Sequence, residues 1–486
     1  MSASRIEPHI FIIFGATGDL MQRSLLPALY NLMSQKKTGN KSIILGCARN
    51  PEMNDKKFRE LAADALTKEK ISIDDKVKIW LENSLYYQGI GSEKLEDFAA
   101  LGERIHRIEK DQNLPGNRIF YLALPPIAFP GTIEKLGNAG LNKSRGWTKL
   151  VVEKPFGRDL ESALALNRLI HKGFDESQVY RIDHYLGKET VQNLLVFRFA
   201  NPIFESLWNR DRVQSVQITV AEELGIGTRA GYYERAGALR DMVQNHLTQL
   251  LTLIAMEVPV AFDSDSIRAE KVKVLRAIVP IQDDKVIFGQ YSGNGINNDK
   301  LAGYLQESGV NPNSKTETYV ALSLDIANWR WHGVPFYLRT GKRLPSRLTQ
   351  IRINFRRAPV SIFDPIGRCD MHYNSLNITL QPDEGFDLCF EMKGLGEPMR
   401  LQTQNLKFRY AEAFAPLPDA YETLLLDIIE GDQTLFVHAD EVESSWKLYT
   451  PVIERQLPVH KYPAGTWGPL EAEKLLQSEG QSWNNP

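Results

Sequence analysis

The sequence predicts two domains: an α/β domain with a parallel sheet over residues 1–180, and a larger α+β domain with a mostly antiparallel sheet over residues 181–486. A chain of 486 residues is too long for one core of ordinary size. Up to about residue 175, short apolar runs alternate with segments of helical periodicity, which is typical of a parallel α/β sheet. Beyond Arg181, several segments alternate apolar and polar residues without long helices between them, which favours antiparallel strands.

The expected elements of the first domain follow in order along the chain. The apolar run HIFIIF is the first strand, and a turn containing glycine follows it at once. The next segment, residues 25–33, has the apolar spacing of a helix. Further apolar runs with the length of buried strands lie at 42–49, 118–126 and 148–157.

The turn after the first strand reads GATGDL and comprises Gly15, Ala16, Thr17, Gly18, Asp19 and Leu20. Between a strand and a helix, such a turn offers unpaired backbone N–H groups and a positive dipole end to a phosphate. Because Thr17 occupies the middle glycine position of GxGxxG, a turn that only needs a flexible backbone is an alternative. Its place after the first strand favours a Rossmann-like dinucleotide-binding domain.

The end of the second expected strand indicates which dinucleotide is bound. An acidic residue there would bind the ribose hydroxyls of NAD, whereas this chain has Arg49, which suits the 2′-phosphate of NADP. A solvated surface arginine is the alternative, and use of NAD as well as NADP stays open.

The second domain is expected to contain one long helix, residues 233–257, among its strands. The GQYSGNGINNDK stretch, 289–300, is interpreted as a loop and the last 20 residues as a polar tail. The expected strands are 212–221, 319–327, 350–355, 376–381 and 387–392.

The long helix carries a candidate general base. At 100° per residue, His246 lies about 140° around the helix from Asp241, on the border between an apolar and a polar side. A general base works best when it is partly desolvated and oriented by a second group. A histidine at the edge of the core is the alternative.

Basic residues elsewhere also suggest ligand binding. Lys154 stands before Pro155 at the end of an expected parallel strand, where ligands bind, and the proline restricts Lys154 to extended geometry. Around Gly341, a basic cluster either binds phosphate or is a solvated loop; its members are Arg339, Lys342, Arg343 and Arg347.

The stretch RIDHYLGKE, 181–189, has five ionisable side chains in nine positions. It is either a solvated loop or a site that holds an anion and moves a proton, and charge density alone does not decide between them. We expect Gly187 to let the backbone turn so that Lys188 points into a pocket.

Composition excludes several classes of function. The net charge of −2 gives no reason to expect nucleic acid or an anionic membrane as a partner. The three cysteines, Cys47, Cys369 and Cys389, are scattered, which predicts neither disulfides nor a structural zinc site and fits a reducing, cytoplasmic location. No signal peptide or long apolar segment is evident.

Five stretches together resemble the glucose-6-phosphate dehydrogenase family, in its bacterial type. In the family's order they are GATGDL, EKPFGRD, FDESQVYRIDHYLGKE, RDMVQNHLTQLL and FYLRTGK, and the resemblance runs from about Phe11 to about Trp467. RIDHYLGKE is highly specific, whereas the glycine turn is not. The resemblance implies an NADP-dependent oxidoreductase that converts D-glucose 6-phosphate to 6-phospho-D-glucono-1,5-lactone, the first step of the oxidative pentose phosphate pathway.

The resemblance also implies roles for individual residues. His246 matches the general base that takes the proton of the C1 hydroxyl as hydride leaves, and Asp183 matches the carboxylate that orients it. Lys154 matches a lysine between cofactor and substrate, and Pro155 a proline that is cis in the family. His184, Tyr185 and Lys188 match the group that binds the substrate phosphate.

Further substrate contacts are implied with different strength. Glu222, Asp241 and Lys342 match residues that hold sugar hydroxyls or phosphate, whereas Arg347 and Gln381 match more loosely. Where many members have a lysine this chain has Ser24, so that Arg23 or Lys154 would have to take over its role.

The resemblance bears on partners too. Leu348 and Thr379 stand where animal members carry basic residues, so a second, structural NADP site is not expected. A homodimer or homotetramer is implied, with no metal, nucleic acid or membrane. Alternatives are a related sugar or sugar-phosphate dehydrogenase of the same fold, or a non-catalytic NADP sensor.

Overall fold

The computed structural model describes residues 6–485 apart from 36, 38–40, 51, 92–93, 294–300, 361, 364–372, 398, 415–417 and 478–479. The chain forms two compact units. Unit 1 comprises the chain up to Lys188 with Ala261–Arg268 and Pro418–Glu443, and unit 2 comprises the rest. The expected domain boundary at residue 180 stays a prediction; residues 181–188 group with unit 1.

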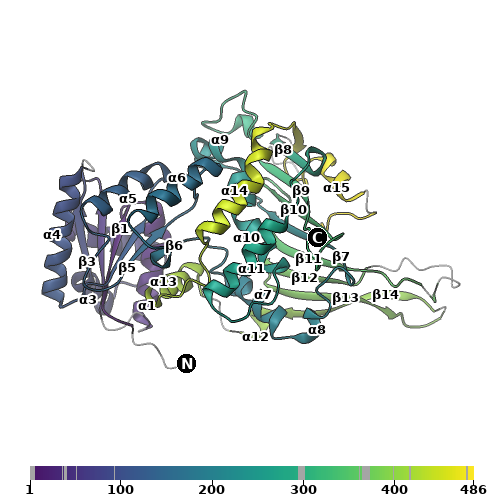
Figure 1. Ribbon diagram of the computed structural model, residues 1–486, viewed down its shortest axis with the longest axis horizontal. Helices are drawn as coiled ribbons and strands as arrows, with labels where there is room; N and C mark the ends of the chain where they lie inside the picture. Colours follow the sequence, from purple (N-terminus) through teal and green to yellow (C-terminus); the bar gives the residue numbers. More distant parts are fainter. Residues whose placement is uncertain are drawn as a thin grey trace. The chain divides into compact units, whose positions relative to one another are not determined.

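Unit 1 contains a six-stranded sheet in which every paired strand is parallel (Figure 1). The strand order β3-β2-β1-β4-β5-β6 is that of a Rossmann sheet, which confirms the predicted α/β domain. The strands are β1 (His9–Phe14), β2 (Ser42–Ala48), β3 (Leu85–Gly89), β4 (Arg118–Leu122), β5 (Thr148–Val152) and β6 (Val179–Arg181).

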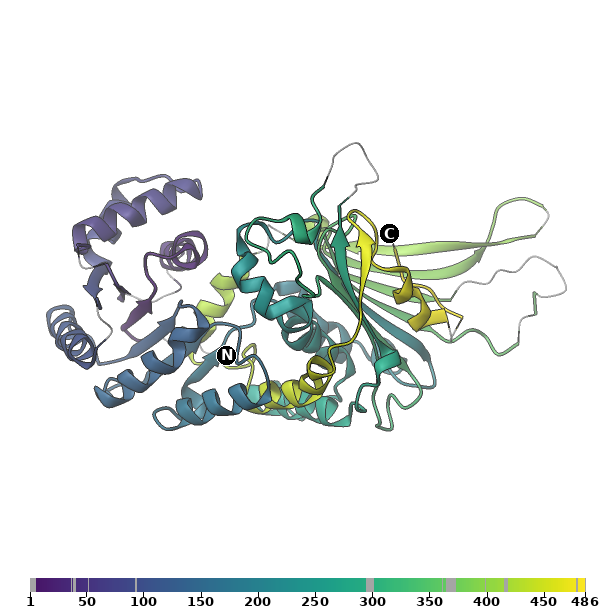
Figure 2. The same ribbon diagram turned by 90° about the horizontal axis from the view of Figure 1, so that it is seen from above.

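Helices lie on both faces of this sheet, as a parallel sheet requires (Figures 1 and 2). Several begin at a side-chain cap: Asn54, Asp74 and Asp159 each accept a backbone N–H of the first turn. The helices are the π-helical η1 (Met21–Leu25), α1 (Leu26–Ser34), α2 (Asp55–Lys68), α3 (Asp75–Ser84), α4 (Leu95–Gln112), η2 (Pro126–Ala128), α5 (Phe129–Asn138), α6 (Leu160–His171), η3 (Glu176–Gln178) and α13 (Ala420–Glu430).

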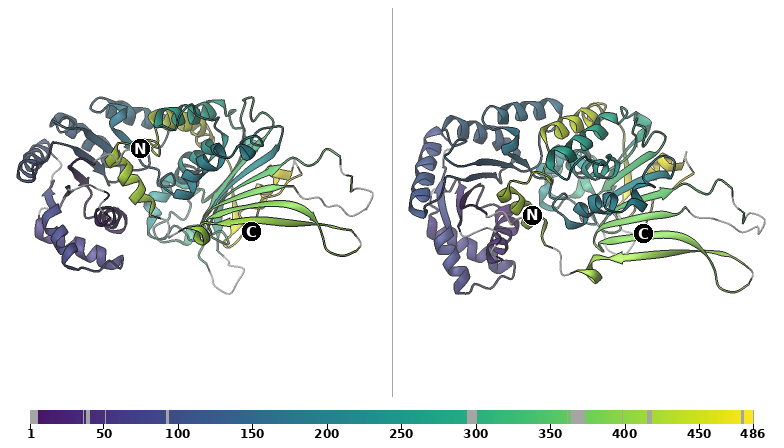
Figure 3. Two further views of the ribbon diagram at one scale, coloured as in Figure 1. Left: turned by 90° about the horizontal axis from the view of Figure 1, so that it is seen from below. Right: turned by 60° about the horizontal axis from the view of Figure 1, so that its bottom comes forward.

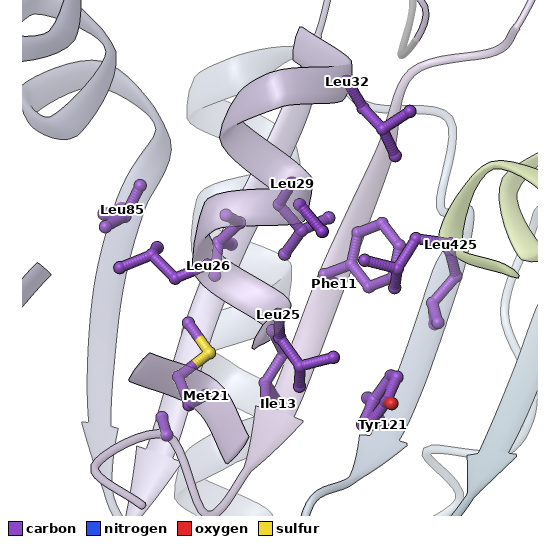
Figure 4. Packing of buried hydrophobic residues seen from close by; sticks show 14 of the residues in the cluster. Phe11, Ile13, Met21, Leu25, Leu26, Leu29, Leu32, Leu85, Tyr121 and Leu425 are labelled. Carbon is purple, nitrogen blue, oxygen red and sulfur yellow. The ribbon is translucent and has the colours of Figure 1, made fainter. Parts of the chain in front are cut away.

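A hydrophobic core on one face of the sheet includes a helix from late in the chain. Phe11 and Ile13 of β1 pack with Leu25, Leu26 and Leu29 at the start of the chain, and Leu425 of α13 packs beside them (Figure 4). These side chains are at most 2% exposed. The face is therefore completed by residues more than 200 positions later in the sequence.

Unit 2 contains a nine-stranded sheet of order β14-β13-β12-β11-β7-β10-β9-β8-β15 (Figure 3). Only the pairs β7–β10 and β8–β15 are parallel among its described pairings, which confirms the predicted mostly antiparallel sheet. The strands are β7 (Val213–Ala221), β8 (Val286–Ser292), β9 (Tyr319–Asp325), β10 (Pro335–Gly341), β11 (Leu348–Phe355), β12 (Ser375–Gln381), β13 (Gly385–Lys393), β14 (Leu401–Arg409) and β15 (Val459–Pro463).

The longer helices gather over one face of this sheet (Figure 3). The helical elements are α7 (Glu189–Phe199), α8 (Pro202–Glu205), η4 (Gly227–Arg229), α9 (Ala230–Ala238), the π-helical η5 (Leu239–Leu247), α10 (Thr248–Ala255), η6 (Asp283–Lys285), η7 (Tyr304–Gln306), α12 (Tyr410–Ala413), η9 (Leu470–Glu473) and α15 (Lys474–Gln477). Two more, α11 (Ser264–Ala277) and α14 (Ala439–Glu454), run from a segment of unit 1 into one of unit 2.

The expected polar tail is instead part of the folded sheet unit. Gln217 of β7 donates to the carbonyl of Ser482 at 2.9 Å and accepts from the N–H of Asn484 at 3.0 Å. Trp483 is 5% exposed and packs in a core cluster with Tyr337 of β10. The tail prediction was wrong because polar side chains of the strands hydrogen-bond the tail backbone.

Only part of the stretch 289–300, which was interpreted as a loop, is described by the structure. Residues 289–292 belong to β8, and 294–300 lie outside the described residues, as does Cys369. In the part of the chain that the structure describes, no helix has both the length and the apolar character needed to cross a bilayer.

His9 makes the stability of unit 1 sensitive to acid. Its ring is 0% exposed and is hydrogen-bonded to the Glu7 carbonyl and the Ser42 hydroxyl. Burial, only partly opposed by the Glu7 bond, lowers the pKa of His9 to about 4. As the pH falls from 6.5 to 4, the unfolded chain therefore takes up this proton before the folded one does, and stability is lost.

At pH 5 this loss is about 2 kcal/mol relative to neutral pH. Urea unfolding of the wild-type chain and of His9→Gln at pH 7 and pH 5 measures it, since the variant lacks this contribution and keeps all others. Equal losses for the two proteins would contradict the assignment.

Candidate functional site

In unit 1, chemically active residues follow the carboxyl ends of parallel strands that are in register. Phe14 pairs with Cys47 on one side and Leu122 on the other, Leu122 with Val152, and Val152 with Arg181. The residues that come next therefore share one edge of the sheet. Near this edge lie the GATGDL turn, Arg49, Lys154 and Asp183.

The glycine turn fits a dinucleotide phosphate. Gly15 has φ +85°, and a Cβ there would lie 2.1 Å from the carbonyl oxygen of Ala123, so the position requires glycine. The following turn leads into the helical segment η1–α1. Gly18 N–H bonds back to Gly15 at 2.9 Å, which closes the turn at the start of the helix.

The second strand leads to a hollow with basic residues. Arg49 is exposed directly after β2. Nearby residues of α2 and β3 line a hollow of about 470 Å³ that includes Lys56, Arg59 and Tyr87. A nicotinamide dinucleotide fits the glycine turn, because a strand, a glycine turn and a helix start together offer backbone N–H groups to a phosphate.

Lys154 is held beside a buried carboxylate that the sequence analysis missed. Glu153 accepts hydrogen bonds from the hydroxyls of Tyr121 at 2.6 Å and Tyr421 at 3.3 Å. Burial raises the pKa of Glu153, against the lowering effect of both hydroxyls and of Lys154. The Lys154–Pro155 bond is cis, as the resemblance implied. An acidic residue directly after the buried run LVV was the available signal.

The RIDHYLGKE stretch forms a tight turn after β6. Asp183, 2% exposed, accepts from the N–H of Tyr185 at 3.0 Å through its carboxylate. Lys188 Nζ lies 4.3 Å from the ring centroid of Tyr185, which lies 5.1 Å from the ring centroid of His184. Three candidate phosphate-binding side chains are thus gathered on one turn, which is not a solvated loop.

Gly187 is required for a different reason from the one expected. Its φ lies outside the left-handed range. A Cβ there would instead lie 2.6 Å from the carbonyl oxygen of Ala420 and 2.8 Å from Cγ of Leu424. The glycine allows close packing against α13 rather than an unusual backbone turn.

In unit 2, the helix around His246 departs from the expected regular helix. Gly237, with φ +62°, breaks it, and residues 239–247 are π-helical. Bonding from i to i+5 widens the helical turn, so the angle between Asp241 and His246 is smaller than the roughly 140° of a regular α-helix. The angle assumed from regular α-helix geometry was therefore wrong.

This helix is buried on its polar side as well as its apolar side. Asp241, His246 and Thr248 are at most 3% exposed. The Thr248 hydroxyl donates to the carbonyl of Val243 at 2.6 Å, and the Ser445 hydroxyl donates to that of Gln244 at 2.6 Å. Carbonyls beside His246 are thus fixed by side chains.

Side chains also satisfy the carbonyls at the carboxyl end of α10. Arg198 donates to those of Leu253 at 2.8 Å and Met256 at 2.9 Å. The indole N–H of Trp208 donates to Ile254 at 2.8 Å, and that of Trp331 to Ala255 at 2.7 Å. Side chains of the protein therefore anchor the helix at its end.

Other candidate substrate residues meet at one edge of the sheet of unit 2. Glu222 and Lys342 follow the parallel strands β7 and β10, and Lys342 Nζ bonds the Glu222 carboxylate at 2.7 Å. Arg347 precedes β11 and donates to Gln381, at the end of β12, at 3.2 Å. Strand register therefore places all four at the same edge.

Two tyrosines that the sequence analysis did not select adjoin this group. The Tyr232 hydroxyl donates to Asp241 at 2.9 Å. The Tyr233 ring lies 5.1 Å from Lys342 Nζ, and burial, reinforced by Asp241 and Glu222, raises the pKa of Tyr233. A helix start reading GYYE carries no motif that would single them out.

The four basic residues around Gly341 do not gather in one cluster. Arg339 is 0% exposed within β10, with its guanidinium 4.9 Å from the ring of Trp467 and 4.6 Å from that of Trp483. Arg343 lies 3.6 Å from Glu307. Only Lys342 and Arg347 remain at the sheet edge.

A Rossmann sheet with a phosphate-binding turn, together with a buried histidine and carboxylate on one helix, defines a nicotinamide-dinucleotide-dependent oxidoreductase. The chain belongs to the glucose-6-phosphate dehydrogenase family. Family models match residues 12–193 (glucose-6-phosphate dehydrogenase, NAD binding domain) and 195–484 (glucose-6-phosphate dehydrogenase, C-terminal domain).

Individual relatives match over nearly their whole length. Glucose-6-phosphate 1-dehydrogenase of Aggregatibacter actinomycetemcomitans is 45% identical, covering 99% of this chain and 98% of the relative. That of Rhizobium meliloti (strain 1021) is 44% identical with the same coverage. A solved glucose-6-phosphate dehydrogenase in complex with its substrate glucose-6-phosphate is 37% identical, with a TM-score of 0.91 over 100% of both chains.

Proposed function

We propose that this chain oxidises D-glucose 6-phosphate at C1 to 6-phospho-D-glucono-1,5-lactone, with NADP+ as the preferred acceptor. The observation that carries the proposal is the gathering of His184, Tyr185 and Lys188 on one turn, since a phosphate dianion needs several fixed cationic or N–H partners. The relative solved with glucose-6-phosphate, 37% identical, supports the same substrate.

The proposed chemistry divides between proton and hydride. His246 takes the proton of the C1 hydroxyl, because hydride leaves more readily from an alkoxide-like carbon. Asp183 is proposed to orient His246 and to stabilise its protonated form. The nicotinamide, when bound, accepts the hydride, and Lys154 is proposed to position the sugar toward it.

The sugar is proposed to be held by the edge of the unit 2 sheet. Glu222 and Asp241 accept hydrogen bonds from sugar hydroxyls, and Lys342, already paired with Glu222 at 2.7 Å, donates. Arg347 and Gln381 are proposed as outer contacts. The proposal requires no metal ion.

An assembly and a location complete the proposal. A homodimer or homotetramer is proposed, for which exposed apolar side chains such as Met392 and Leu406 on β13 and β14 offer a surface. A monomer in sedimentation equilibrium would overturn it. Free Cys47 and Cys389 accord with the cytoplasmic location, which localisation of the tagged protein in cells tests.

Replacement of the proposed base should slow the chemical step. His246→Asn is expected to lower kcat by about 10²–10⁴-fold with little change in KM, because binding contacts are retained. Steady-state rates with saturating NADP+ measure this. In a double-mutant cycle with Asp183→Asn, the kcat of the double variant should be little lower than that of His246→Asn alone. Additive losses in log kcat would contradict the proposed pairing of Asp183 with His246.

Removal of the phosphate partner should discriminate between phosphorylated and free sugar. Lys188→Ala is expected to raise KM for glucose 6-phosphate by about 10–100-fold, from loss of a charge-assisted hydrogen bond, and to leave oxidation of glucose nearly unchanged. Initial rates with each sugar test this, with the exposed Lys172→Ala as control. Equal loss with both sugars would favour a related sugar dehydrogenase, and no turnover by the wild-type chain would favour an NADP sensor.

Cofactor preference should depend on Arg49. Arg49→Ala is expected to raise KM for NADP+ by about 10-fold or more and to leave that for NAD+ unchanged, because only NADP+ carries the 2′-phosphate. Rates with each dinucleotide at saturating sugar measure the ratio. A parallel rise in both KM values would exclude contact with the 2′-phosphate.

A further inference from the structure

A segment from late in the chain contacts the turn that carries the proposed phosphate-binding residues. Residues 418–443 belong to unit 1, although the family model of the C-terminal domain spans them. Within this segment, α13 packs against β1 and β4 in the core shown in Figure 4. The residues after α13 then pass along β6, where Val437 N–H donates to the Arg181 carbonyl at 3.1 Å.

Arg181 fixes the end of β6 through its side chain as well. Its guanidinium is 1% exposed and contacts both carboxylate oxygens of Glu176, at 2.5 and 3.2 Å. It also donates to Asn167 at 3.0 Å, and Asn167 in turn donates to Glu443 at 2.8 Å. Arg181 is therefore tied to α6 on one side and to the late segment on the other.

Glu176 is the centre of this arrangement. Besides Arg181, it accepts from the N–H of Ala439 at 2.9 Å and contacts His171 at 2.8 Å and His438 at 3.3 Å. Burial alone would raise the pKa of Glu176, but the charge of Arg181 and the bonds from Arg181 and His171 outweigh burial and lower it to about 2. The carboxylate is ionised at any pH at which the enzyme would work.

Residues 418–443 also contact the carboxyl-terminal end of the Asp183–Lys188 turn. Gly187 packs so closely on Ala420 and Leu424 of α13 that a Cβ would lie 2.6 and 2.8 Å from their atoms. Gln433 donates to the carbonyls of Glu176 at 3.1 Å and Val179 at 2.9 Å. Residues 183–188 are thus fixed between two points, Arg181 and Gly187, that both rest on residues 418–443.

We propose that Arg181 and Glu176 are positioning residues for substrate binding, and that residues 418–443 act through them to hold the Asp183–Lys188 turn in place. This inference rests on the proposed function, in which that turn binds the substrate phosphate. Arg181 touches no substrate; it sets where His184, Tyr185 and Lys188 stand. Displacement of such contacts by about 1 Å can cost roughly 100-fold in activity.

Unit 1 offers a matched control for the Arg181–Glu176 pair. Arg118, at the start of β4, contacts both carboxylate oxygens of Glu109 at 2.7 and 2.9 Å, and the two side chains are 4% and 11% exposed. Arg118 lies at the amino end of its strand, whereas Arg181 lies at the carboxyl end. Loss of either pair should lower stability, but only loss of the Arg181–Glu176 pair should move the Asp183–Lys188 turn.

The test compares Arg181→Lys with Arg118→Lys in the full chain. Lysine keeps the charge and loses the two-point contact. Arg181→Lys is expected to raise KM for glucose 6-phosphate by about tenfold or more and to leave KM for NADP+ unchanged, while both variants lower the melting temperature. Hydrogen–deuterium exchange of residues 183–189 should be faster in Arg181→Lys only.

Each outcome decides the question. Equal KM values and equal exchange in the two variants would overturn the positioning role. If Arg181→Lys does not fold, Gln433→Ala, which removes two hydrogen bonds from the same segment, must show the same effects to a smaller degree, and a wild-type result for it would overturn the role. If the wild-type chain does not oxidise glucose 6-phosphate, the proposed function fails, whereas the exchange comparison still decides whether the segment holds the turn.

Discussion

A helix buried on its polar side imposes the strictest constraint in unit 2: each of its buried polar groups must find a partner within the protein. Several backbone carbonyls of the π-helical residues 239–247 and of α10 meet this requirement with donors from distant parts of the chain, whereas Oε1 of Gln249 has no hydrogen-bond partner among the described residues. Trp208, Trp331 and Arg198 bond the final carbonyls, and Thr248 and Ser445 bond carbonyls beside His246. Since a buried unpaired group costs about 1–3 kcal/mol, few displacements of this helix are tolerated. The hydrogen bonds to the carbonyls of this helix therefore also fix the position of His246, the proposed base.

Unit 1 reaches comparable order by a different route. Its parallel strands are in register, so that Gly15, Arg49, Lys154 and the RIDHYLGKE turn all follow the carboxyl ends of strands and lie near one another. Only the RIDHYLGKE turn needs further contacts to hold it, because β6, the strand before it, has three residues and is the outermost strand of the sheet. Arg181, Glu176 and the late segment supply what a longer, central strand would otherwise provide.

Sequence periodicity predicted the buried strands of the framework but not the geometry of the candidate site. Buried strands such as 9–14 and 42–48 were predicted because continuous apolar runs of that length have few other uses. The π-helix was not, since the angle between Asp241 and His246 follows from an assumed 100° per residue that this segment does not obey. Arg339 was assigned either to a phosphate-binding cluster or to a solvated loop, because a buried arginine between two tryptophans requires partners more than 120 residues away. Tyr421 was missed for the same reason, as no local pattern reports its contact with Glu153 across 268 residues, whereas Glu153 itself had a local signal in its place directly after a buried strand.

The packing of α13 onto β1 has a consequence for the order of events during synthesis. The first 188 residues leave the ribosome without the side chains of Leu424, Leu425 and Ile428, which fill one face of their sheet. At about 5–20 residues per second, roughly 13 to 50 seconds pass before residue 443 is made. During that time the apolar surface around Phe11 and Leu29 lacks its cover, and the nascent Rossmann sheet is a candidate client for chaperones. A fold that appears sequential along the chain is completed only near its end.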